Sequence, residues 1–281
     1  TLDTAGVVDA AAFTNLRHVE RVQLNAGGND ITLTQAFAAS ADGGRVLVFS
    51  GGGANSVDAS ATTSTILYYT GAGTETFLGG SGADTVAAST ATLSGADTLV
   101  GGNGSALDIL QLSGGTYTAA MLAGVREFER VQLLAPGSQL FLALGMPATS
   151  SSSFAVLGTS GNDQVTAAAG ETARVGFNPL GGSDRFTGAD GDDQINIAVA
   201  DLDGSDIFNG GAGRDRIGFL TAGTITVAQQ AGLSSIETFS LSSAGPNTVY
   251  LGTNLPNVNV AGGTNVDVVY MGLPTQYCSL G

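Results

Sequence analysis

The sequence contains no lysine and no tryptophan, and it has a single cysteine and a single histidine. A lone Cys278 excludes a framework of internal disulfides and a zinc site built from several thiolates. A lone His18 excludes the HExxH zinc helix of metalloproteases, which needs two histidines. No Gly-x-Ser-x-Gly nucleophile motif is present either. We therefore predict that the chain is not an enzyme.

Long apolar runs and positive charge are also scarce. No apolar run approaches the roughly 18 residues of a membrane-spanning helix, so we expect no membrane insertion. Nine basic residues, all arginine, stand against 24 acidic ones, for a net charge of −15 over 281 residues. This excess of negative charge repels nucleic acid and anionic lipid, and we expect no nucleic-acid partner. Hydrophobic residues make up 43% of the chain, which excludes a disordered acidic tail.

The sequence repeats itself with a period of about 109 residues. Similar segments at 13–26, 122–135 and 231–243 contain Glu20, Glu129 and Glu237 at equivalent places. Aspartates repeat at the same interval, as Asp84 with Asp193, Asp97 with Asp206, and Asp108 with Asp215. We divide the chain into repeat copies 1–108, 109–215 and a partial copy 216–281, which together form one continuous solenoid. The incomplete third copy suggests a segment of a longer repeat array.

The same alignment bears on the lone histidine. His18 corresponds to Glu127 and Ser235 in the other copies. A position that accepts three unrelated side chains is expected to be exposed and without a catalytic role.

Short alternating stretches of β character follow the aspartates, at 84–86, 97–100, 108–112, 193–197, 206–208 and 215–219. Short strands between closely spaced tight turns predict an all-β fold, a parallel β-roll or β-helix solenoid with roughly 20 residues per coil. Residues 44–51 and 257–263 are predicted to be rungs without aspartate. The only helical turns expected lie near 118–122 and 228–232. Because aromatic residues make up only 6% of the chain, we expect a narrow core of Val, Ile, Leu and Ala.

Two segments, GGSGADTV at 79–86 and GGAGRDRI at 210–217, match the pattern Gly-Gly-x-Gly-x-Asp-x-apolar. Looser versions occur at 158–165, 181–186 and 188–195, and the version at 101–108 has a two-residue insertion. With these motifs the chain resembles the RTX (repeats-in-toxin) family of calcium-binding β-roll proteins. The resemblance covers the turn blocks at about 79–110 and 158–217.

The residue types also fit calcium chemistry. Glycine permits turn conformations in which carbonyl groups converge, and each aspartate adds a carboxylate. Two stacked turns then offer about six hard oxygens at the 2.3–2.6 Å that Ca²⁺ prefers. The predicted calcium-binding residues are Asp84, Asp97, Asp108, Asp163, Asp184, Asp193, Asp206, Asp215, Gly80, Gly82, Gly211 and Gly213. The alternative is that these aspartates only cap their own turns, without metal.

The resemblance extends to bacterial surface-layer proteins and large RTX adhesins. It implies an extracellular structural protein, exported by type I secretion to the bacterial cell surface, that self-associates head-to-tail or as a lattice. A carbohydrate-binding RTX module of a polysaccharide-modifying enzyme is the alternative. In that case Tyr68, Tyr69, Tyr250 and Tyr270 would form a stacking surface for a polysaccharide, although tyrosines also pack in cores.

Overall fold

The computed structural model describes residues 1–146 and 154–279. The chain separates into two compact units. Among the described residues, unit 1 comprises 1–134 with 145–146, and unit 2 comprises 135–144 with 154–279. Each unit is a parallel β-solenoid, which confirms the predicted fold class. This division into two units differs from the three-copy division by repeats.

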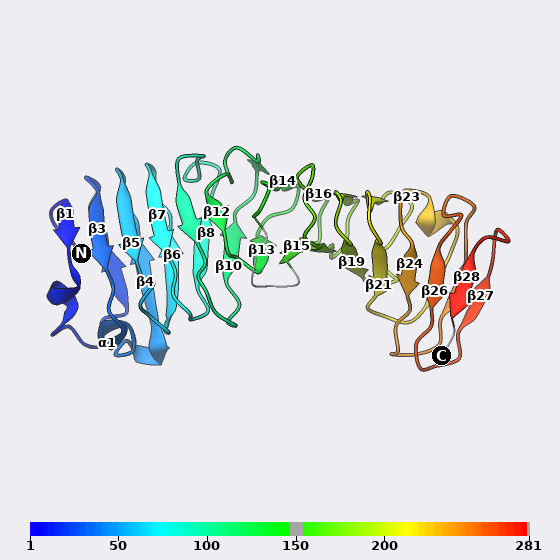
Figure 1. The fold of residues 1–281 in the computed structure, drawn as a ribbon, viewed down its shortest axis with the longest axis horizontal. Coiled ribbons are helices and arrows are strands. Elements are labelled where there is room, and N and C mark those ends of the chain that lie inside the picture. The colour runs from blue at the N-terminus through cyan, green and yellow to red at the C-terminus, as the bar shows by residue number, and fades with distance from the viewer. Residues whose placement is uncertain (147–153, 280–281) are drawn as a thin grey trace. The chain divides into compact units, whose positions relative to one another are not determined.

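In unit 1 the chain coils alternately through two parallel sheets (Figure 1). Sheet I contains β1 (Gly6–Val8), β3 (Asn29–Thr32), β5 (Asn55–Asp58), β7 (Glu75–Leu78), β9 (Thr98–Val100) and β12 (Val125–Arg126). Sheet II contains β2 (Arg21–Gln23), β4 (Arg45–Phe49), β6 (Thr65–Tyr69), β8 (Thr85–Ala88), β10 (Ile109–Leu112) and β13 (Arg130–Leu133). The remaining elements are the 3-10 helices η1 (Ala10–Phe13) and η2 (Asp42–Gly44), the helix α1 (Gln35–Ala38) and the short strand β11 (Thr116–Tyr117).

Unit 2 has three sheets with the same parallel pairing. Sheet III contains β14 (Gln139–Phe141), β16 (Gln164–Thr166), β18 (Arg185–Thr187), β20 (Ile207–Asn209) and β23 (Leu233–Ser234). Sheet IV contains β15 (Phe154–Leu157), β17 (Val175–Asn178), β19 (Gln194–Ile197), β21 (Arg216–Phe219), β24 (Thr238–Ser240), β26 (Asn259–Ala261) and β28 (Tyr277–Ser279). Sheet V contains β22 (Thr224–Ile225), β25 (Thr248–Tyr250) and β27 (Val268–Tyr270), and the 3-10 helix η3 spans Ala228–Gln230.

Most of the predicted local structure is confirmed. Strands follow all six aspartate turns, as β8, β9, β10, β19, β20 and β21, and the rungs without aspartate are β4 and β26. The expected helical turn near 228–232 is η3, whereas residues 118–122 form turns. Helix α1 was not predicted; it begins where the Thr34 hydroxyl accepts the Phe37 N–H at 3.2 Å, as an N-cap does.

The core is more aromatic than the composition predicted. Ten of the twelve phenylalanines are buried, beside aliphatic residues from every sheet. Phe177 of sheet IV meets Phe186 and Phe208 of sheet III, with ring centroids 5.9 and 6.4 Å away. The few phenylalanines are thus buried in the core, where two sheets of one unit face each other. The expectation of a core of Val, Ile, Leu and Ala was therefore wrong.

Three equivalent positions share an uncommon backbone conformation. His18, Glu127 and Ser235 have φ angles of 55°, 60° and 49°, and they are the non-glycine residues with positive φ in the described chain. One repeat period separates each of them from the next. His18 and Ser235 are exposed and Glu127 is half-buried. The repeat therefore specifies a backbone turn here and leaves the side chain free to vary.

Candidate functional site

The eight predicted aspartates lie in the turns that precede strands, and all of them are buried, with no more than 2% of the residue exposed. They do not lie side by side as a cluster. Each stands one rung away from the next, in rows that run along the stack of coils. We name these rows ladders I to IV after the sheets whose strands they precede.

Ladder II shows how each carboxylate is used. Asp84 Oδ1 accepts the N–H of Ile66 in the preceding rung at 2.7 Å, and Asp84 Oδ2 accepts the N–H of Gly80 in its own turn at 2.9 Å. The Asp84 N–H donates in turn to Asp108 Oδ1 at 2.7 Å. The Asp108 N–H donates to Glu129 Oε2, also at 2.7 Å. The Asp84 side chain therefore bonds the backbone of the preceding rung through one oxygen and closes its own turn through the other.

Ladder IV repeats this arrangement in unit 2. The N–H of Val175 donates to Asp193 Oδ1, that of Asp193 to Asp215 Oδ1, and that of Asp215 to Glu237 Oε2, each at 2.8 Å. Ala189 donates to Asp193 Oδ2 at 3.2 Å. Glu129 and Glu237, which the repeat made equivalent, both end a ladder.

Ladder III consists of aspartates alone. Asp163, Asp184 and Asp206 accept through Oδ1 the N–H groups of Ser138, Asp163 and Asp184, at 2.9, 2.7 and 2.9 Å. Thr159 and Asp203 close the turns of Asp163 and Asp206 by donating to Oδ2 at 2.7 and 2.9 Å.

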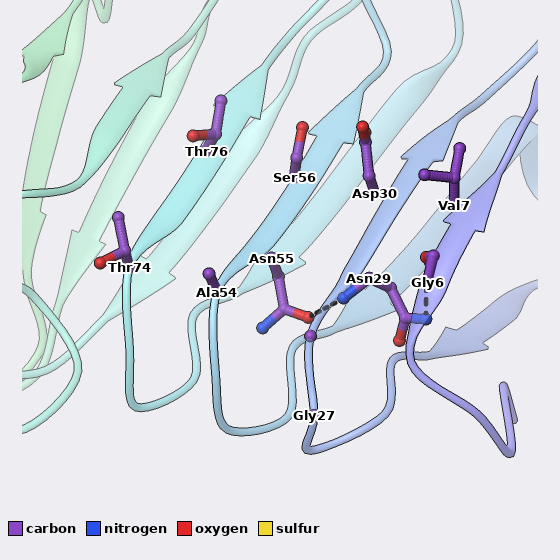
Figure 2. Close-up of a pocket in the computed structure, with 11 residues that line it drawn as sticks. Gly6, Val7, Gly27, Asn29, Asp30, Ala54, Asn55, Ser56, Thr74 and Thr76 are labelled. Carbon is purple, nitrogen blue, oxygen red and sulfur yellow. Dashed lines mark hydrogen bonds between the residues drawn. The ribbon is translucent and has the colours of Figure 1, made fainter.

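Ladder I mixes amides with carboxylates. Asn29 donates its N–H to Asn55 Oδ1 at 3.0 Å and its side-chain amide to the Gly6 carbonyl at 3.3 Å, and Glu75 donates its N–H to Asp97 Oδ1 at 2.8 Å. Figure 2 shows Asn29 and Asn55 at the start of their strands, with the bonds of Asn29 to Asn55 and to Gly6. These asparagines line a shallow recess of about 320 Å³ together with Asp30, Ser56 and Thr76, which Figure 2 labels on the same strands and on β7.

Sequence reasoning missed several members of these ladders. Glu75 is fully buried and is bonded by the Tyr68 hydroxyl and, at 2.8 and 2.9 Å, by the Ser50 hydroxyl. It precedes Asp184 by one repeat period, so the repeat marks it as a ladder position. The same period relates Asn29 to Ser138. The signal that marks these positions is the repeat period and not the residue type, because they carry Glu, Asn or Ser where other rungs carry Asp.

The predicted glycines have a steric role in the stack. A Cβ at Gly80 would lie 2.0 Å from the Thr62 carbonyl oxygen, and one at Gly82 would lie 2.6 Å from that of Ser64. At Gly211 and Gly213 the carbonyl oxygens of Ala189 and Gly191 would lie at 2.4 and 2.5 Å, and both glycines have positive φ. Successive turns therefore pack backbone against backbone.

Burial disfavours the ionised form of several of these carboxyl groups. Loss of hydration raises the pKa of Asp84 and Asp193 to about 6, against the effect of the N–H groups that they accept. The same cause, with neighbouring carboxylates adding to it, raises the pKa of Asp108, Asp184 and Asp215 to about 7. Burial likewise raises the pKa of Asp206. At neutral pH the ladders therefore hold negative charge that the protein compensates only in part.

The fit of calcium to these residues is partial. N–H donors, and not carbonyl oxygens, face most of the carboxylate oxygens. Asp184 Oδ2 and Asp215 Oδ2 are two exceptions, because each is buried without a hydrogen-bond partner. Within residues 1–146 and 154–279, three or more Asp, Glu, His or Cys side chains do not gather at any point as a metal-ligand group. Calcium binding by the eight aspartates stays a prediction.

The tyrosines proposed as a stacking surface separate into two groups. Tyr68 is fully buried, so its place on that surface was wrong. Tyr69 stacks on Phe49 with centroids 4.5 Å apart. Tyr250 and Tyr270 stack on each other at 4.7 Å and are 42% and 53% exposed.

No helix in the described ranges is long and apolar enough to cross a membrane. Comparisons of the chain with protein-family models, with curated proteins and with solved structures found no match. The likeness to the RTX family therefore depends on the turn motifs alone.

Proposed function

We propose that this chain is part of an extracellular, calcium-stabilised structural repeat protein of a surface-layer, filament or adhesin-like assembly. The observation that carries the proposal is the use of the same ladder bonds in both units. Buried carboxylates at the same repeat positions join each turn to the next, and these bonds hold the stacked coils together. A network of buried hydrogen bonds between stacked coils suits a structural scaffold.

The electrostatics of the ladders support a role for calcium. Buried aspartates with raised pKa values disfavour folding at neutral pH, and a divalent cation would offset their charge. Asp184 Oδ2 and Asp215 Oδ2 are the oxygens with spare capacity for such a cation. Extracellular calcium at roughly 10⁻⁴–10⁻³ M is the concentration at which modules of this kind respond. Localisation at the bacterial surface and type I export belong to the proposal through the RTX resemblance.

The edge strands of the sheets support the proposed self-association. Strand β1 ends sheet I, and β27 and β28 end sheets V and IV, in the described chain. Parallel edge strands accept further strands from another copy or from more of the same array.

Light scattering and negative-stain microscopy with millimolar calcium and with EDTA test the assembly. We expect filaments or sheets that form with calcium and dissolve on chelation. A monodisperse species of 27.8 kDa in calcium would contradict self-association of this chain.

A carbohydrate-binding role is the second candidate, and the exposed pair Tyr250 and Tyr270 favours it. Sugar rings stack on aromatic side chains through their apolar faces. A glycan array separates the two candidates. Binding that is lost in Tyr270→Ala, without any assembly in calcium, would favour the carbohydrate-binding module.

A further inference from the structure

Three of the nine arginines surround one small pocket on unit 2. The pocket has a volume of about 130 Å³ and is lined by Arg174, Arg214 and Arg216 together with Asp192, Gln194 and Thr238. The strand register places Arg174 on the rung of β17 and both Arg214 and Arg216 on the rung of β21, with the rung of β19 between them, because Gly176 pairs with Gln194 and Gln194 with Arg216. Guanidinium groups from two coils, with one coil between them, thus line the same pocket in a chain of net charge −15.

The fold does not require these arginines. The repeat aligns Arg174 with Thr65, Arg214 with Leu107 and Arg216 with Ile109. Those positions of unit 1 belong to the same kind of turn and strand, since Ile66 and Val175 donate equivalent ladder bonds. Neutral side chains therefore serve in one unit where three positive charges stand in the other.

Arg174, Arg214 and Arg216 do not form ion pairs within the described part of the protein. Among the described residues, the one ion pair within 4.0 Å joins His18 and Asp42. Arg174 Nε donates to the Asp192 carbonyl at 3.1 Å, and Arg216 Nη2 donates to Gln194 Oε1 at 2.5 Å. Both acceptors are neutral, so the guanidinium charges have no carboxylate partner.

Two acidic residues also face the pocket. Asp192 Oδ1 accepts the backbone N–H of Arg214 at 2.8 Å. Asp193, the other acidic residue lining the pocket, is buried in ladder IV, where its two oxygens accept the N–H groups of Val175 and Ala189. Arg174, Arg214 and Asp192 are exposed and Arg216 is half-buried, whereas Asp193 is buried. The accessible side therefore has more guanidinium groups than carboxylates.

We propose that Arg174, Arg214 and Arg216 form a binding site for an oxyanion, that is, a carboxylate, sulfate or phosphate group. The planar guanidinium fork matches the oxygens of such groups, and Arg is the residue that binds them in bidentate fashion. The pocket has room for one such group. Thr238, which lines the same pocket, pairs with Arg216 in the strand register.

Nuclear magnetic resonance of the arginine Nε–H groups tests the site directly. Inorganic sulfate, inorganic phosphate and acetate are each titrated at constant ionic strength set with sodium chloride. We expect saturable shifts of the Arg174, Arg214 and Arg216 resonances, assigned through single Arg→Gln variants, and no saturable shift for Arg17 or Arg126. Equal shifts of all nine resonances, or none, would overturn the proposal.

A matched variant completes the test. The triple substitution Arg174→Thr, Arg214→Leu and Arg216→Ile introduces the side chains that unit 1 carries at these positions, so the fold is expected to persist. Anion affinity should fall at least tenfold in the triple variant and stay within twofold in Arg126→Gln, which removes one positive charge from unit 1. Unchanged affinity in the triple variant would refute the site. Saturation by acetate identifies a carboxylate ligand, and saturation by sulfate and phosphate alone identifies a tetrahedral one.

Discussion

Asp84 and Asp193 hold the same position in successive copies of the repeat, and they make the same three hydrogen bonds in different units. Each accepts the N–H of a residue 18 positions earlier, at 2.7 and 2.8 Å, and each closes its own turn by accepting the N–H four positions earlier. Each then donates its own N–H to the next aspartate of its ladder. The repeat therefore preserves a bonding pattern together with a residue type.

The ladders predict different costs for two similar substitutions. Asp193→Asn replaces one of two N–H acceptors by a donor, and we expect the free energy of unfolding to fall by about 1–3 kcal/mol. Asp215→Asn can keep Oδ1 as the acceptor and removes a buried charge whose other oxygen has no partner. Its cost should be smaller, or the variant more stable, at pH 7 to 8. Urea unfolding of both variants measures the difference, and an equal or reversed order would contradict the ladder assignment.

Stability should fall with rising pH when no divalent cation is present. The folded-state pKa values of about 6 for Asp84 and Asp193, and about 7 for Asp108, Asp184 and Asp215, lie above the unfolded value of about 3.9. The folded state therefore binds more protons between about pH 4 and 7. Stability is highest at the acidic end of this window, declines through it, and levels off above pH 7.

Urea midpoints at pH 5 and pH 8 in EDTA test this sign. High salt in both buffers screens the general repulsion of the acidic surface. The Asp215→Asn variant should show a shallower decline than the unsubstituted protein. A midpoint that rises with pH would show that the buried carboxyls are better compensated than their surroundings indicate.

Calcium should raise the melting temperature at neutral pH, and EDTA should lower it. The gain comes from neutralising ladder carboxylates, so we expect it to shrink at pH 5, where protons occupy the same oxygens. Magnesium should replace calcium poorly, because it holds its octahedral water shell. Melting curves that do not respond to EDTA or calcium would mean that the N–H bonds hold the turns without metal.

We expect turn glycines to differ in how far alanine at their position destabilises the fold. Gly80→Ala would place Cβ 2.0 Å from the Thr62 oxygen, and we expect a loss of about 3 kcal/mol or more because stacked turns must separate. The control Gly52→Ala lies in the same unit, where the nearest atom would be 3.4 Å away, and should change stability by less than about 1 kcal/mol. Chemical unfolding compares them. Similar losses in both variants would argue against backbone-to-backbone packing at Gly80.

Local sequence determined the strands of the solenoid and the positions of its tight turns. Alternation after Asp84, Asp108, Asp193 and Asp215 indicates short strands with one buried face, and glycine before each aspartate indicates a tight turn. The repeat period also relates His18, Glu127 and Ser235, whose shared positive φ is a property of the turn. These features depend on neighbours in the chain, so the sequence contains enough to predict them.

Tertiary structure decided what the side chains do. An aspartate at a turn can face a metal, its own backbone or the next coil, and the choice depends on which atoms the adjacent rung presents, a full coil away along the chain. Only the stacked coils reveal that Asp84 and Asp193 meet N–H groups, that Glu75 shares this role with the aspartates, and that Tyr68 points inward. The convergence of Arg174, Arg214 and Arg216 has the same origin, because residues of separate coils become neighbours only when the coils stack in register.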